Sequence, residues 1–395
     1  MPLFYLISHY SNLPFRAWEQ RKLRDIANYR NGKAHEQVED EDGKYTIINS
    51  KFISTNGKVQ RYTNEQVEPI FDGEIAMVLS DLPNGKALAK LFLVKEDGKY
   101  TLNQRIAGIT PNENIDPIFL NFRMNRNNYF LKFDSGVTQT NLSKSQVENF
   151  IALYPTFDEQ YKIGLFFTQL DDTIALHQRK LDALKLMKKG FLQQMVTKSG
   201  ENIPKIRFDD FDDIWEQRIL GEFLKESKIK GSNGSLAKKL TVKLWRKGVV
   251  PKEEIYTGSS ATQYYIRKTG QFMYGKLDFL NQAFGIVPLE LDGYESTLDS
   301  PAFDIEESLN ETFLLEYVSL ARFYKYQGNI ANGSRRAKRI HTDTFFEMPI
   351  PLPNSNEQQK IGTFSQQIDD LITLQQNKLE KLSSLKRFYL KNMFI

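Results

Sequence analysis

The chain has 395 residues, 40% of them hydrophobic and 26% charged, which predicts more than one folded domain and excludes a disordered tail. It contains no cysteine, and this excludes a disulfide scaffold, a thiolate metal site and a cysteine nucleophile while fitting a cytoplasmic protein. Lys and Arg number 53 against 49 Asp and Glu, so a surface for nucleic acid requires local segregation of positive charge.

The amino terminus is mildly apolar up to Phe15, but it has no basic segment at its start and no small-residue cleavage site. It therefore does not resemble a signal peptide. No run of about 18 apolar residues occurs in the sequence, so no membrane span is predicted. We expect a soluble, intracellular protein.

Short apolar runs between turn residues predict a mixed α/β domain over residues 1–154. The clearest strands are Tyr45–Ile48, Ile75–Leu79 and Leu91–Val94, which are bounded by Asp-Gly and Asn-Gly turns. Residues 199–352 predict a second domain of this kind, with strands at Gln271–Tyr274 and Phe284–Leu289. Each domain precedes a segment of a different character.

Long helices are predicted in these two segments, residues 155–198 and 353–395. In both, seam positions recur at alternating steps of four and three over about four heptads, which is the coiled-coil pattern. The seams occupy equivalent positions: Ile163, Phe167, Leu170, Ile174, His177, Leu181, Leu184, Lys188, Phe191 and Met195 in the first helix, and Ile361, Ser365, Ile368, Ile372, Gln375, Leu379, Leu382, Lys386, Tyr389 and Met393 in the second.

The chain contains an internal repeat, in which a domain followed by a long helix occurs twice. Pro155–Gly164 and Pro353–Gly362 share the pattern Pro-x-x-x-Glu-Gln-x-Lys-Ile-Gly at a spacing of 198 residues. Trp18–Arg21 and Trp215–Arg218 share Trp-Glu-Gln-Arg at a spacing of 197. The helices are closely alike and the domains diverge. The predicted fold class is α+β, with two mixed α/β domains alternating with two long helices that pair as a coiled coil.

Paired carboxylates occur at equivalent positions of both helices. Neighbouring helical residues point about 100° apart, so such a pair cannot converge on one metal ion. The carboxylates are either solvated positions or contacts for a partner, and as partner-binding candidates they are Asp171, Asp172, Asp369 and Asp370. His177 and Gln375 share one seam position, where a polar residue more often sets register than binds a ligand.

Motifs of self-contained enzymes are missing. The sequence has no G-x-x-x-x-G-K-[ST] phosphate loop, no G-x-G-x-x-G after a strand, no H-E-x-x-H, no G-x-S-x-G elbow and no Asn-Pro-Pro-Tyr-like tetrapeptide of amino-methyltransferases. The four histidines are scattered without ligand spacing. We predict no catalytic residue, no metal site and no cofactor on this chain.

A DNA-binding surface is the chemistry that the sequence does favour. No acidic residue occurs from Tyr317 to Thr342, where arginines and lysines accumulate around an Asn-Gly-Ser turn and aromatic residues alternate with them. The first domain offers a polar segment before its helix and two further turns. The DNA-binding candidates are Asn84, Lys86, Gln104, Arg105, Thr138, Gln139, Thr140, Asn141, Lys276, Ser334, Arg335, Arg336, Lys338 and Arg339.

In the Trp-Glu-Gln-Arg starts and the Pro-x-x-x-Glu-Gln-x-Lys-Ile-Gly helix openings, the sequence resembles a specificity subunit of a type I restriction-modification system, over essentially its whole length. The resemblance implies that residues 1–154 and 199–352 are target-recognition domains, each reading one half of a bipartite, asymmetric sequence in double-stranded DNA. It also implies that the helices pack antiparallel as a spacer. Two methyltransferase (modification) subunits would supply S-adenosylmethionine and adenine methylation, and restriction/translocase subunits would supply ATP and Mg chemistry.

Two other hypotheses remain at this point. The chain could be a coiled-coil scaffold whose globular domains bind protein partners, which salt dependence of DNA affinity would separate from a DNA reader. It could also be an enzyme fused to a recognition domain, although the missing motifs argue against this.

Overall fold

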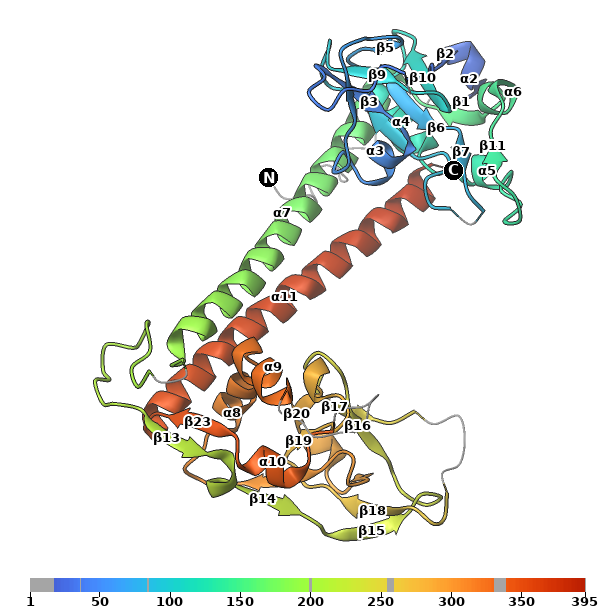
Figure 1. The fold of residues 1–395 in the computed structure, drawn as a ribbon. Coiled ribbons are helices and arrows are strands. Elements are labelled where there is room, and N and C mark those ends of the chain that lie inside the picture. The colour runs from blue at the N-terminus through green and yellow to red at the C-terminus, as the bar shows by residue number, and fades with distance from the viewer. Residues whose placement is uncertain are drawn as a thin grey trace, which may run out of the picture. The chain divides into compact units, whose positions relative to one another are not determined.

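The computed structural model describes residues 18–35, 37–83, 85–198, 201–253, 259–329 and 339–394. The chain divides into two compact units. The first unit comprises Met1–His177 and Lys378–Ile395, and the second comprises Gln178–Asn377. Each unit therefore contains one domain and a portion of each long helix (Figure 1).

The first unit is built on two four-stranded sheets. One is antiparallel, in the order β2-β10-β6-β8, and the other has the order β4-β3-β9-β5 with β3 and β9 parallel. Two short ribbons, β1-β12 and β11-β7, complete its strands. The strands are β1 (Glu19–Lys22), β2 (Ala27–Asn31), β3 (Tyr45–Ile48), β4 (Tyr62–Thr63), β5 (Pro69–Ile70), β6 (Ile75–Val78), β7 (Ser80–Asp81), β8 (Leu91–Leu93), β9 (Tyr100–Leu102), β10 (Ile106–Pro111), β11 (Thr140–Asn141) and β12 (Ile151–Tyr154).

The second unit repeats the first antiparallel sheet despite its divergent sequence. Its order, β14-β22-β19-β20, matches β2-β10-β6-β8 strand for strand in relative chain position. A three-stranded sheet, β15-β18-β21, and the ribbons β16-β17 and β13-β23 surround it. The strands are β13 (Glu216–Ile219), β14 (Leu224–Ser227), β15 (Lys230–Asn233), β16 (Leu240–Val242), β17 (Val249–Pro251), β18 (Gln263–Ile266), β19 (Phe272–Tyr274), β20 (Phe284–Ile286), β21 (Glu295–Ser296), β22 (Ala302–Ile305) and β23 (Pro349–Leu352).

Short helices cover these sheets, and they begin where polar side chains cap them. The Asp116 carboxylate accepts a hydrogen bond from the Phe119 amide, and the Asn310 side chain does the same for Phe313. The short helices are α2 (Leu23–Ile26), α3 (Ser50–Ser54), α4 (Pro117–Met124), α5 (Asn128–Leu131), α6 (Lys144–Glu148), α8 (Glu311–Val318), α9 (Ala321–Asn329) and α10 (Thr342–Phe346), with 3₁₀ turns at Leu220–Glu222, Phe279–Asn281 and Leu289–Leu291.

The predicted strands are found where apolar runs are continuous. Tyr45–Ile48 is β3 as predicted, and all four side chains of β6 are buried. The run from Phe284 to Leu289 is shorter than predicted, because the strand ends at Ile286 and a 3₁₀ turn begins after Pro288.

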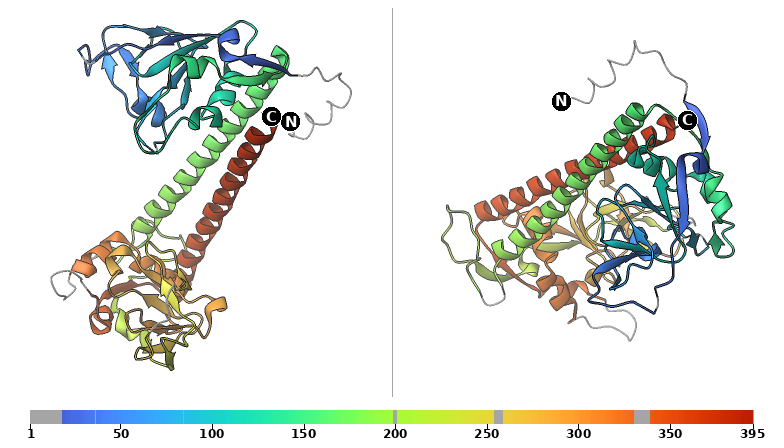
Figure 2. Two further views of the ribbon diagram at one scale, coloured as in Figure 1. Left: turned by 90° about the vertical axis from the view of Figure 1, so that its right-hand side faces the viewer. Right: turned by 90° about the horizontal axis from the view of Figure 1, so that it is seen from above.

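The two long helices are α7 (Phe157–Met195) and α11 (Ser355–Met393), each of 39 residues. In the first unit the start of α7 lies beside the end of α11 (Figure 2). The rings of Phe166 and Tyr389 are 5.2 Å apart there. In the second unit the end of α7 contacts the start of α11, with Phe191 and Phe364 5.6 Å apart. The helices therefore pair antiparallel, as predicted, and every described seam side chain is buried or half-buried.

The seam also enters the core of each domain. Ile163 and Phe167 belong to the core of the first unit, and Met195 and Ile361 belong to the core of the second. Each domain is thus packed directly on the helix pair.

The repeated motifs meet at this junction. The indole N–H of Trp18 donates to Glu159 at 3.3 Å, and the N–H of Trp215 donates to Glu357 at 3.1 Å. Gly164 and Gly362 let each helix approach its domain, because a Cβ there would meet Asp116 or Asn310.

The glutamine of each helix opening completes the junction. Gln160 is 2% exposed and Gln358 is 0% exposed. Gln160 accepts from the Asp116 amide and donates to the Pro155 carbonyl. Gln358 makes the same two bonds, to the Asn310 amide and the Pro353 carbonyl. One glutamine in each unit therefore joins the helix, the preceding loop and the capped end of α4 or α8.

Candidate nucleic-acid interface

Three candidate segments of the first unit meet at one edge. The Leu142 amide donates to the Leu79 carbonyl at 2.8 Å, and the Leu79 amide donates to the Arg105 carbonyl at 2.9 Å. Strand β11 pairs with β7, with Thr140 opposite Asp81. The segments around Lys86, Gln104–Arg105 and Thr138–Asn141, far apart in sequence, therefore adjoin one another.

The side chains on this edge differ in accessibility. Lys86, Gln104, Arg105, Thr138, Gln139 and Asn141 are exposed. Thr140 is buried, and its hydroxyl donates to the Asp134 carboxylate at 3.2 Å, so this side chain is turned inward. Asn84 lies outside the described residues.

Asp81 shapes the turn that carries Lys86. Its carboxylate accepts hydrogen bonds from the amides of Leu82, Ala87 and Leu88, at 2.9, 2.6 and 3.0 Å. Three backbone amides donating to one carboxylate stabilise the conformation of this loop. Lys86 therefore projects from an ordered turn.

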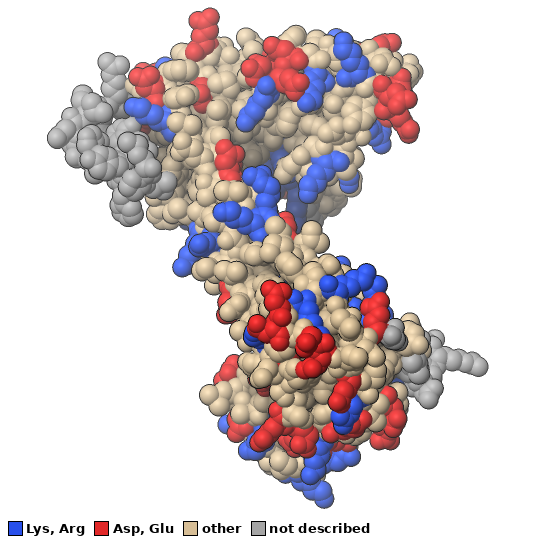
Figure 3. All heavy atoms as spheres, turned by 90° about the vertical axis from the view of Figure 1, so that its left-hand side faces the viewer, with Lys and Arg blue, Asp and Glu red and all other residues tan. Residues whose placement is uncertain are grey.

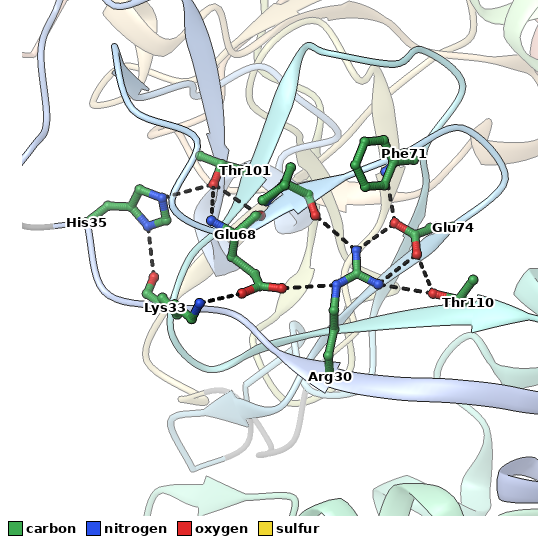
Figure 4. Close-up of polar contacts among 9 residues, drawn as sticks. Arg30, Lys33, His35, Glu68, Phe71, Glu74, Thr101 and Thr110 are labelled. Atoms are coloured by element: carbon green, nitrogen blue, oxygen red, sulfur yellow. Dashed lines mark hydrogen bonds and ion pairs between the residues drawn. The ribbon is translucent and has the colours of Figure 1, made fainter.

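A partly buried polar network elsewhere in the first unit has a different role. Arg30 binds both oxygens of Glu74 at 2.6 Å and also Glu68 at 3.1 Å, and Lys33 pairs with Glu68 at 3.1 Å (Figure 4). Burial tends to raise the pKa of Glu74, but the hydrogen bonds from Arg30 and Thr110 hold it below its usual value. These charges compensate one another, and their ion pairs connect β2 to the segments that precede β5 and β6.

In the second unit, Lys276 and Arg339 adjoin one another. The Lys276 amide donates to the Asp299 carbonyl, the Ile340 amide donates to the Lys276 carbonyl, and Arg339 pairs with the Asp299 carboxylate at 2.9 Å. Burial lowers the pKa of Lys276. Ser334, Arg335, Arg336 and Lys338 lie outside the described residues, which stop at Asn329 and resume at Arg339.

The acid-free stretch has a structural role as well. Arg322 donates to the carbonyls of Gln193 and Val196, at 3.0 and 2.7 Å, and so satisfies the carboxyl end of α7. Phe323 and Tyr324 are buried in the core, whereas Lys325 and Tyr326 are exposed. The alternation of aromatic and basic residues there partly reflects the division of α9 into a buried face and an exposed face.

The predicted partner-binding carboxylates separate into two kinds. Asp171 pairs with Lys386 in the first unit, and Asp369 pairs with Lys188 in the second. These are equivalent pairs of the repeat, and they hold α7 to α11. Asp172 and Asp370 point to solvent.

The sequence did not reveal a buried ionic network in the second unit. Glu316 is 3% exposed and accepts from Arg246 through both oxygens, at 2.6 and 2.7 Å, from Lys188 at 2.9 Å and from Ser365 at 2.7 Å. Burial opposes its ionisation, but Arg246 and Lys188 lower its pKa to about 2. The residues come from four separate segments, so no local pattern marks the network.

Charge on the surface is mixed. Figure 3 shows Lys and Arg interspersed with Asp and Glu over the drawn face of each unit. Among the described residues there is no group of three or more His, Asp or Glu side chains that could hold a metal ion. No helix in the same part of the chain is long and apolar enough to cross a membrane.

Comparison with known proteins gives the class. The sequence profile of the type I restriction modification DNA specificity domain matches residues 16–186 and 302–384, which is more than half of the chain. The chain therefore belongs to the type I restriction-modification DNA specificity family, whose members are recognition subunits rather than enzymes. They bind DNA and the other subunits of their complex.

Individual relatives agree with this assignment. The chain is 22% identical over 393 residues to the type I restriction enzyme MjaVIII specificity subunit of Methanocaldococcus jannaschii, covering 94% of this chain and 90% of that protein. Its fold is similar to the type I S subunit from M. genitalium, with a TM-score of 0.61, 13% identity and coverage of 98% and 97%. A chain from a study of complex assembly and conformational transition in the type I system has a TM-score of 0.57, 16% identity and coverage of 96% and 98%.

Proposed function

We propose that each unit reads one half of a bipartite, asymmetric DNA target in the cytoplasm, and that α7 and α11 set the spacing between the halves. The first half would be contacted by the edge around Lys86, Arg105 and Asn141, and the second by the region that includes Lys276 and Arg339. The support is the architecture: the same antiparallel sheet occurs twice, and each domain is fixed to the helix pair by the same glutamine contacts.

Two modification subunits would dock on the helices, one per repeat. The supporting observation is an exposed stripe that both helices carry with identical residues. Gln169, Asp172, Leu176 and Lys180 on α7 correspond to Gln367, Asp370, Leu374 and Lys378 on α11, and all eight side chains are exposed.

The fold does not require these identities. At 100° per residue the four positions lie within about 80° of one helix face, away from the seam. Leu176 is 43% exposed and Leu374 is 52% exposed. Contact with solvent alone does not favour a leucine at these positions. A partner that binds twice would constrain both copies equally. In this proposal the modification subunits bring S-adenosylmethionine and adenine methylation, and further subunits bring ATP and Mg chemistry.

Stoichiometry tests the docking sites. Native mass spectrometry of the wild-type complex should show two modification subunits per chain. Leu176→Asp or Leu374→Asp should each leave one, and the double variant should leave none, because a buried unpaired carboxylate opposes docking. Leu186→Asp is the matched control, since Leu186 is 72% exposed and its counterpart in the repeat is Ser384. Retention of two subunits by the double variant would reject these sites.

A further inference from the structure

A basic cavity opens in the second unit, lined by residues of the carboxyl-terminal end of α7, of helix α9 and of the turn between β16 and β17. Its volume is about 390 Å³. Five cationic side chains and one carboxylate line it, so its net charge of +4 equals that of the whole chain. The charged lining residues are Lys185, Lys188, Lys189, Arg246, Lys325 and Glu316.

Only some of this charge is compensated inside the protein. Lys188 and Arg246 are the partly buried cations of the lining, and Glu316 and Asp369 neutralise them. Lys185, Lys189 and Lys325 are exposed, and none has a carboxylate within 4.0 Å among the described residues. Three positive charges therefore line the cavity without an ion pair to any described carboxylate.

The adjoining turn is held in an unusual conformation. Trp245 and Arg246 have φ values of 59° and 56°, in a hairpin turn where Asn and Gly are the usual residues. Their amides donate to the carbonyls of Asn281 and Gln282, at 2.8 and 3.0 Å, which fixes the turn. Left-handed backbone at bulky residues is strained and concentrates at functional sites. Here it places Arg246 against Glu316 and leaves Trp245 57% exposed between two exposed lysines, Lys243 and Lys247.

The ligand must be anionic, and the surroundings favour DNA. Lysine binds phosphate as a mobile point charge, without the planar geometry that carboxylate recognition by arginine exploits. Lys325 belongs to α9, inside the stretch from Tyr317 to Thr342 that contains no acidic residue. Lys243 and Lys247, in the same turn as Trp245, add two exposed positive charges.

We propose that this basic cavity and the Trp245 turn bind backbone phosphates of the DNA that the second unit reads. The contact is independent of base sequence, and it orients the duplex beside the recognition loops. This inference rests on the proposed function as a DNA reader.

Salt dependence of binding tests it. The complex with modification subunits would be titrated with a duplex carrying its target and with one of equal length lacking it, over a series of salt concentrations. For Lys185→Gln/Lys189→Gln/Lys325→Gln, the slope of log affinity against log salt should fall in magnitude by about 2 to 3, since each phosphate contact contributes roughly 0.9. The loss should be equal for both duplexes. The control, Lys162→Gln/Lys381→Gln/Lys391→Gln, removes three exposed helix lysines outside both the cavity and the docking stripe and should keep the slope.

Three other results are possible, and each would reject either this inference or the proposed function. An unchanged slope in the cavity variant overturns the inference. So does unchanged DNA affinity together with loss of modification subunits, which would identify an acidic protein segment as the ligand. A wild-type complex that binds both duplexes equally at every salt concentration would instead reject the proposed function.

Discussion

In both units the same residue types hold the domain on the helix pair. The units differ in how carboxylates balance the charge of one lysine that occurs at equivalent positions of the two helices. In the first unit Lys386 pairs with Asp171 and lies 5.3 Å from the ring centre of Phe122. In the second unit the equivalent Lys188 pairs with Asp369 and also with the buried Glu316, which in turn holds Arg246. Glu316 and Phe122 follow the caps of α8 and α4 at the same distance in sequence.

The comparison distinguishes contacts that both halves of the repeat share from contacts that only one half makes. The Trp–Glu and glutamine contacts are common to both junctions, so they define how a domain sits on its helices. The ionic network belongs to the second unit, beside the basic cavity. The second junction should therefore be the more sensitive to loss of one charge.

The largest effect is expected at Glu316. Glu316→Leu leaves Arg246 and Lys188 without their buried partner, and removing one member of such a network costs about 3–5 kcal/mol. Amide hydrogen exchange in α8 and α9 should accelerate by on the order of a hundredfold or more. Phe122→Leu at the equivalent place should accelerate exchange in α4 far less, because it removes no charge. Equal acceleration in the two units would show that the junctions are energetically alike.

Low pH should weaken the same ionic network by protonating Glu316. The folded-state pKa of Glu316 is about 2, below the ordinary value of 4.5. The stability it contributes, about 3 kcal/mol, is therefore fully present above pH 4.5 and is lost as pH falls from 4.5 towards 2. Hydrogen exchange in α8, corrected for intrinsic rates, should show this dependence. Glu316→Gln should abolish it, and a dependence that persists in that variant would assign it to another carboxylate.

A smaller and equal effect is expected at the two glutamines. Gln160→Leu and Gln358→Leu each leave a buried amide and a buried carbonyl unsatisfied, at a cost of about 1–3 kcal/mol. Protection should fall by similar factors at the amino-terminal ends of α4 and α8. A loss confined to one unit would contradict the view that the repeated motif performs the same task twice.

Much of the architecture could be predicted from periodicity. The steps of four and three along the seam predict both α7 and α11, and the antiparallel pairing that the family resemblance implies is confirmed. Strands such as β3 and β6 are predictable because their apolar runs are continuous. The Trp-Glu-Gln-Arg and Glu-Gln motifs are recognisable as repeats, but that Trp18 meets Glu159 depends on contacts between distant segments.

The interface was less predictable. Composition alone singles out separate turns around Lys86, Arg105 and Asn141. Only the pairing of β7 with β11, together with the hydrogen bond from the Leu79 amide to the Arg105 carbonyl, places them at one edge. Composition also groups Thr140 with its neighbours, although strand alternation turns its side chain inward. Arg246 and Glu316 carry no local signal, because a buried ion pair between residues 70 positions apart is a property of the fold. The DNA-contacting roles of all the candidates remain predictions.

The most direct test of the whole account is methylation of duplexes in which the spacing between the two half-sites is varied. The wild-type complex should methylate one split target at a single spacing and lose activity when one base pair is inserted or removed, because in the proposed function the helices set the distance between the readers. Exchanging either half-site for an unrelated sequence should also abolish methylation. Methylation that tolerates any spacing, or that needs only one continuous sequence, would contradict two readers joined by a spacer.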